Sequence, residues 1–112
     1  MQFCTDLLSE HKDLFLEARA YLLSFSGIEE IKKERITTYM SAPSTNARGG
    51  ICHMRTMPYG IDLGFLKGAK MKDDLGLLSG KGKVLRVLSL KSMNEEVIKY
   101  YVDQAVDLNF KK

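Results

Sequence analysis

The chain has 112 residues, a formal net charge of +3 and an apolar fraction of 45%. This length allows one domain over residues 1–112, which can bury about two-thirds of the surface that its unfolded chain exposes. The mild charge excludes a histone-like protein and a strongly acidic one. No apolar run reaches the roughly 18 residues that a membrane span needs.

The first predicted element is a helix over Thr5–Phe25, which Gly27 is expected to end. His11 falls inside its apolar stripe, so we expect a partly buried histidine that hydrogen-bonds to backbone. The stripe follows helical spacing and consists of Leu7, Leu14, Phe15, Ala18, Tyr21, Leu22 and Phe25.

The same predicted helix carries four carboxylates that are spaced four, three and four residues apart. They are Asp6, Glu10, Asp13 and Glu17. This spacing places them on one exposed edge of a helix. Carboxylate oxygens are hard ligands that suit multivalent cations. Two alternatives follow for this edge: a weak metal site or an ordinary solvated helix face.

After a short amphipathic connection over Ile28–Lys33, the pattern predicts three strands. They are expected over Glu34–Ser41, Ile51–Met57 and Tyr59–Phe65, with a turn over Ala42–Gly50. Strands joined by such short turns form an antiparallel meander.

Two polar residues of the second strand, His53 and Arg55, alternate with Cys52 and Met54 and therefore face the opposite side of the sheet. We expect them on the face without helices, either as solvated surface or as the lining of a shallow site. Further candidates for this lining come from the first strand, if the register allows: Arg35, Thr37 and Tyr39.

Glycines and lysines then flank a single helical turn near Leu75–Leu78, and Val84–Leu90 is apolar enough to be a strand that is covered on both faces or central in its sheet. Ser92 and Glu95 form a capping box for the last helix. The fold class is α+β: a two-layer sandwich in which N- and C-terminal helices pack on one face of an antiparallel sheet of four to five strands. The predicted core contains Leu14, Phe15, Leu22, Phe65, Leu85, Val97 and Tyr101.

The motifs of a known family lie in the second half of the chain. The segment IDLGFLKGAKMKDDLGLLSGKGKVLRVLSLKS, followed by VIKYYVDQAVDLN, resembles the signature of the YdhG-like domains of unknown function. Many members carry His where this chain has Val87. The matching positions are Phe65, Gly68, Leu77, Leu78, Gly80, Gly82, Lys83 and Arg86.

The resemblance implies a fold similar to that of the frataxins, in agreement with the predicted sandwich. Some members of the family are described as iron chaperones, and frataxins bind iron through an acidic first helix. By this analogy, iron is the metal expected at Asp6, Glu10, Asp13 and Glu17.

Charge is uneven along the chain, since residues 63–91 carry seven basic side chains and two acidic ones. The GLLSGK segment is no nucleotide P-loop, because the glycine spacing is short and a strand follows it. Its glycines and lysines instead suit a lone phosphate or carboxylate, or serve only the geometry of the connection. The candidate anion-binding residues are Lys70, Lys81, Gly82, Lys83 and Arg86.

No nucleophile–base pair is visible in the sequence, so we expect a binding or delivery domain and no enzyme. Its leading function is weak iron binding by the acidic helix edge. The alternative is binding of an anion, a nucleic acid or an acidic protein through residues 67–91. With two cysteines and no secretory pattern, the domain is expected to be cytoplasmic, a monomer or weak homodimer, and free of membranes.

Overall fold

The structure is a computed structural model that describes residues 1–41 and 50–110. Six antiparallel strands form one sheet in the order β1-β2-β3-β4-β6-β5. The predicted turn over Ala42–Gly50 lies outside the described residues except for Gly50. The strands are β1 (Ile28–Lys32), β2 (Thr37–Ser41), β3 (Gly50–Met57), β4 (Gly60–Phe65), β5 (Leu78–Ser79) and β6 (Arg86–Leu90).

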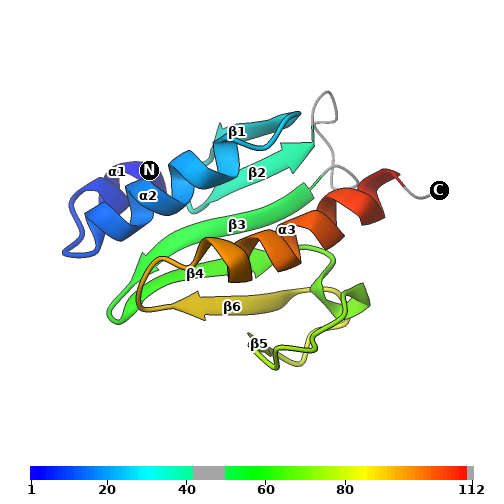
Figure 1. Ribbon diagram of the computed structural model, residues 1–112. Helices are drawn as coiled ribbons and strands as arrows, with labels where there is room; N and C mark the ends of the chain where they lie inside the picture. The colour runs from blue at the N-terminus through cyan, green and yellow to red at the C-terminus, as the bar shows by residue number, and fades with distance from the viewer. Residues whose placement is uncertain (42–49, 111–112) are drawn as a thin grey trace.

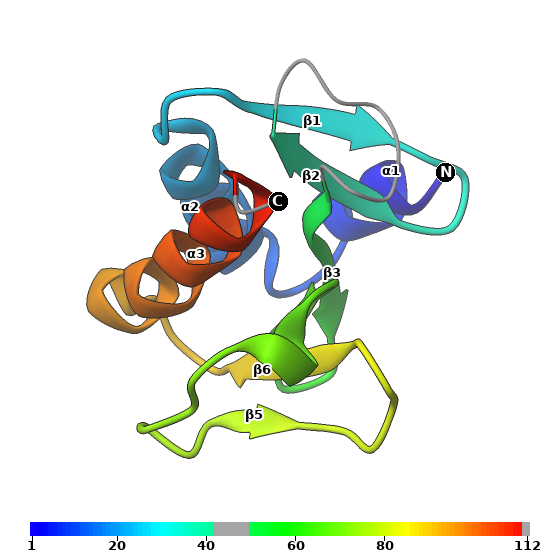
Figure 2. The ribbon, with the colours of Figure 1, turned by 90° about the vertical axis from the view of Figure 1, so that its right-hand side faces the viewer.

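The helices are α1 (Gln2–Leu7), α2 (Lys12–Leu23) and α3 (Glu95–Phe110), with one 3-10 turn, η2, at Gly68–Lys70. α2 and α3 lie side by side on one face of the sheet and leave the other face open (Figures 1 and 2). The predicted α+β class with helices from both ends of the chain on one antiparallel sheet is therefore confirmed. No helix within the described ranges is long and apolar enough to cross a bilayer.

The core lies between these two helices and the sheet. It includes the predicted residues Phe15, Leu22, Phe65 and Tyr101, none of which is exposed. Leu14 and Val97 pack against it while only partly buried. Leu85 was predicted wrongly, because it lies on the open side of the sheet with 38% of its surface exposed.

The predicted first helix is in fact two helices. α1 ends at Leu7, and α2 begins at Lys12 after a turn in which the Ser9 hydroxyl accepts the His11 backbone N–H at 3.0 Å. The break lets α1 reach the sheet: the Asp6 carboxylate accepts hydrogen bonds from the backbone N–H and the hydroxyl of Thr56, at 3.0 and 2.7 Å. The expected backbone contact of His11 is present, since its Nε2 lies 3.0 Å from the Pro58 carbonyl oxygen.

The sheet has more strands than the four to five predicted, because both edge strands were missed. Ile28–Lys32 is strand β1 and no mere connection, since each of its residues pairs with one of β2. Leu78–Ser79 is the short strand β5, and the single helical turn lies earlier, at Gly68–Lys70. The edge strand β5 has only two residues, and such a short edge strand offers little template for pairing with another chain.

Two details of the second half also differ from prediction. β6 lies within the sheet between β4 and β5, which is one of the two expected alternatives, but it is covered on one face only. Val84, expected within this strand, precedes it with 56% of its surface exposed. The last helix is capped by Asn94 and not by Ser92, because the Asn94 side-chain oxygen accepts the Val97 backbone N–H at 3.2 Å.

Candidate ligand pocket on the open sheet face

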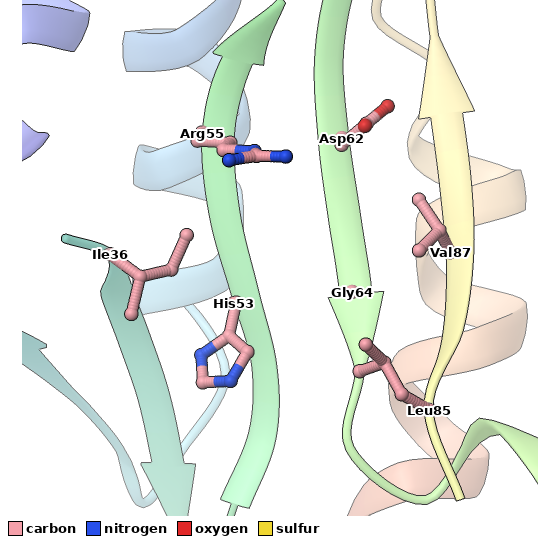
Figure 3. Close-up of a pocket in the computed structure, with 7 residues that line it drawn as sticks. All are labelled: Ile36, His53, Arg55, Asp62, Gly64, Leu85 and Val87. Atoms are coloured by element: carbon pink, nitrogen blue, oxygen red, sulfur yellow. The ribbon is translucent and has the colours of Figure 1, made fainter. Parts of the chain in front are cut away.

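The open face carries a shallow pocket of about 140 Å³ over the middle of β3, β4 and β6 (Figure 3). Strand pairing builds it, because His53 pairs with Gly64 and Gly64 with Val87 in one row, while Arg55 pairs with Asp62 in the next. The seven lining residues are Ile36, His53, Arg55, Asp62, Gly64, Leu85 and Val87. Apolar surface thus forms most of the lining, with three polar side chains among it.

Gly64 forms the floor of this pocket. A methyl group there would lie 3.5 Å from the nearest Leu85 side-chain carbon and 3.9 Å from the His53 Cβ, both ordinary contact distances. Gly64 is also absent from the glycines with positive φ. Neither packing nor backbone geometry therefore requires a glycine at this position. The missing side chain opens the pocket.

His53 stands at one wall as a half-buried, neutral imidazole. Its Nδ1 lies 2.9 Å from the Thr38 hydroxyl oxygen, which fixes the ring against β2. Burial lowers the pKa of His53, and the positive charge of Lys33 lowers it further. The ring therefore stays uncharged near neutral pH and presents one hydrogen-bonding nitrogen besides the one that faces Thr38.

Asp62 and Arg55 stand at the opposite end, and Figure 3 shows the Arg55 side chain extending from β3 towards β4. The Asp62 carboxylate accepts hydrogen bonds from the Tyr59 hydroxyl and, at 2.7 Å, from the Ser89 hydroxyl. Although Arg55 and Asp62 are cross-strand partners, no ion pair joins them among the salt bridges of the described residues. The exposed Arg55 guanidinium is thus left to face solvent and the pocket.

The predicted placement of His53 and Arg55 on the face without helices is correct, and they line a pocket together. Cys52 lies fully buried on the other face, where burial raises the pKa of its thiol and keeps it unreactive. Thr37 and Tyr39 were wrong candidates, since Thr38 is the residue that pairs with His53. Tyr39 instead points into the covered side, where its hydroxyl donates to Glu30 at 2.8 Å.

Arg35 does not line the pocket either, and its neighbour Ile36 does. Asp62, Gly64 and Val87 also line the pocket and were not among the candidates predicted from the sequence. A usable signal was present: Asp62 and Gly64 alternate with Ile61, Leu63 and Phe65, so they had to face away from the helices.

The four acidic residues predicted to share one helix edge do not do so. Asp6 belongs to α1 and is fully buried, Glu10 lies in the turn between the helices, and Asp13 and Glu17 belong to α2. Within residues 1–41 and 50–110, no group of three or more metal-ligating side chains lies close enough to hold an ion. The geometric basis of the predicted iron site is therefore wrong, because the chain turns after Leu7 to bring Asp6 to β3.

The predicted anion-binding residues are not gathered in one site. Lys70, on η2, lines a separate groove beside α3. The chain after it is bound to that helix, since the Gln104 side-chain oxygen accepts the Lys72 backbone N–H at 2.7 Å. Lys81 and Lys83 are exposed in the loop between β5 and β6, on the other side of the sheet in Figure 2.

Arg86 serves that loop as a structural residue. Its guanidinium donates to the carbonyl oxygens of Gly82 and, at 2.9 Å, of Leu85. Gly80 has φ +117°, a conformation that favours glycine, whereas Gly82 is not among the positive-φ glycines. These contacts explain the glycines and the arginine by loop geometry, and they leave Lys81 and Lys83 as the exposed cations of the loop.

The chain was compared with models of protein families, with curated proteins and with solved structures, and none of the three comparisons found a match.

Proposed function

We propose that this chain is a non-enzymatic binding domain and that its ligand site is the pocket on the open sheet face. The observation that carries the proposal is the unfilled position at Gly64, flanked by His53 on one side and Val87 on the other. Small-molecule sites are concave and mostly apolar, with a few placed polar groups. The pocket matches this description.

The polar groups of the pocket support binding better than catalysis. A nucleophile needs a base within hydrogen-bond reach. The Thr38 hydroxyl lies 2.9 Å from the His53 ring, but only 2% of Thr38 is exposed, so this pair is closed to a substrate in the pocket. The Ser89 hydroxyl donates to Asp62, and no histidine joins that contact among the hydrogen bonds of the described residues. Each of these contacts fixes a side chain in place, as a binding site requires.

The resemblance to the YdhG-like family, some of whose members are described as iron chaperones, suggests delivery as a role, but within residues 1–41 and 50–110 no group of three or more ligating side chains could hold iron. The basic-loop alternative keeps one supporting observation, the exposure of Lys81 and Lys83 beside each other in the β5–β6 loop. The pocket is favoured over that loop because it is concave and is lined by residues of three strands, β3, β4 and β6, whereas the loop offers charge alone.

The proposal is tested by NMR with uniformly ¹⁵N-labelled protein at constant ionic strength. The probes are benzoate, benzamide, benzamidine, acetate and inorganic phosphate. We expect at least one of them to shift the backbone amides of His53, Gly64 and Val87 in a saturable way. The matched variant is Gly64→Val, which fills the floor with a residue favoured in strands and should abolish these shifts while the remaining spectrum is kept.

Two outcomes would overturn the proposal. One is a failure of every probe to shift the pocket amides. The other is an equal shift in Gly64→Val. If a single-stranded oligonucleotide instead binds with a steep salt dependence and the Lys81→Glu, Lys83→Glu double variant abolishes that binding, the basic loop is the functional surface.

A further inference from the structure

From the size and charge of the same pocket, we infer the class of its ligand: a small planar monoanion, namely a carboxylate on a six-membered ring or a group of similar size. This inference rests on the proposed function and adds the chemistry of the ligand to it.

The volume sets the size of the ligand. The pocket holds about 140 Å³, close to the cavity of about 150 Å³ that accommodates one benzene molecule in an engineered protein core. The floor at Gly64 is flat because no side chain rises from it, and the side chains of Leu85 and Val87 stand beside it (Figure 3). A flat apolar ring is the shape that covers this floor with the least empty space.

The charges around the pocket favour an anion. The Arg55 guanidinium is exposed and outside the ion pairs of the described residues, and it carries a planar fork of donors that matches a carboxylate. The charge of Lys33 also reaches the site, since it acts on His53. A carboxylate that bound at Arg55 would therefore sit in a positive potential.

Asp62 is the one lining residue with the opposite charge, and its hydrogen bonds reduce its influence. Both the Tyr59 and the Ser89 hydroxyl donate to its Oδ1. These donors lie on the side of β6, and Figure 3 shows the carboxylate directed away from Gly64. Two donors on one oxygen disperse its charge, whereas no ion pair of the described residues compensates the charge of Arg55. The net preference of the site is thus for a negative group next to Arg55.

The experiment compares three probes of nearly equal shape: benzoate, benzamide and benzamidine. Each is titrated into ¹⁵N-labelled protein at fixed ionic strength, and Kd is obtained from the Gly64 and Val87 amide shifts. We expect benzoate to bind about tenfold more tightly than either of the others, the scale of one charged hydrogen bond. Arg55→Gln should remove that advantage, and Lys12→Gln, which removes an exposed charge on α2, should leave it unchanged.

The outcomes separate this inference from the proposed function. Equal affinity for benzoate and benzamide would show that the pocket does not discriminate between a charged and a neutral ligand. This result would overturn the inference, but the pocket would remain the ligand site. Tighter binding of benzamidine, lost in Asp62→Asn, overturns the inference in favour of a cationic ligand. Benzoate binding that survives Arg55→Gln also overturns it. Failure of all three probes to reach the pocket counts against the proposed function itself.

Discussion

The two faces of the sheet are built from alternate residues of the same strands, and they differ in how completely they are filled. On the covered face, Cys52, Met54, Leu63 and Phe65 have no exposed surface. On the open face, the intervening positions hold polar residues such as His53, or no side chain at all at Gly64. Neighbours along one strand therefore have opposite roles.

The covered face of the sheet provides stability, and the open face is available for ligand binding. A side chain on the covered face is surrounded by the core, so its removal leaves a cavity. A side chain on the open face touches solvent, so the protein can carry an unfilled position or an unpaired cation there at little cost. The open face is free to bind because the covered face provides the stability.

The largest effect is expected on the covered face, at Phe65. Its ring is fully buried and packs 5.8 Å from the Tyr101 ring, centroid to centroid. Phe65→Ala should lower the free energy of unfolding by about 3–5 kcal/mol, the usual cost of a large cavity. The matched change on the open face, Val87→Ala, should cost less than about 1 kcal/mol. Equilibrium urea unfolding measures both, and similar costs at the two positions would show that the open face also belongs to the core.

A smaller loss is expected at Asp6, which joins α1 to the edge of β3. β2 begins at Thr37, which pairs with Met54, so β2 does not extend far enough to pair with Thr56. The Thr56 backbone N–H therefore donates to the Asp6 carboxylate. Asp6→Ala leaves that partly buried donor without its acceptor, which should cost about 1–3 kcal/mol of unfolding free energy. The control Glu17→Ala changes an exposed carboxylate of α2 and should stay within about 0.5 kcal/mol of wild type.

The same pair of variants tests the iron hypothesis. If Asp6 has only a structural role, any change in melting temperature that ferrous iron causes under anaerobic conditions should be the same in the wild type and in both variants. A metal-induced stabilisation of the wild type that disappears in both variants would instead restore the acidic residues as a joint site and contradict the role assigned to Asp6.

Elements with strong local patterns were predictable. The alternation in Ile61–Phe65 and in Cys52–Arg55 placed β3, β4 and both faces correctly. β1 was not predictable in this way, because Ile28 and Ile31 do not alternate and its pairing with β2 defines it as a strand. The break between α1 and α2 was hidden for another reason. Its cause is a contact of Asp6 with a residue 50 positions away.

The pocket was predictable only in part. The side of the sheet that His53 and Arg55 occupy follows from alternation alone. The importance of Gly64 depends on the register between β3 and β4, which sets it opposite His53 and which no local pattern states. The same limit explains Thr37 and Tyr39: their alternation was correct, but the register of β2 puts Thr38 beside His53.

The smallest effect is a pH dependence that belongs to the open face. Burial lowers the pKa of His53 below its ordinary value of 6.5, and Lys33 lowers it further. The unfolded chain therefore binds a proton at this residue at a higher pH than the folded one does. From about pH 6.5 down to the folded pKa, the unfolded state holds more protons, so acidification destabilises the fold. His53→Gln removes this contribution.

Urea unfolding at pH 7.5 and pH 5 should consequently show a larger loss of stability in the wild type than in His53→Gln. An NMR titration of the His53 ring should give a pKa below 6.5. Bound benzoate should raise that pKa, because a negative group in the pocket favours the imidazolium form. Equal pH dependence in the two proteins would mean that His53 is as well hydrated as an exposed histidine. His53 would then not form a half-buried wall, and the pocket on the open face would lose one of its sides.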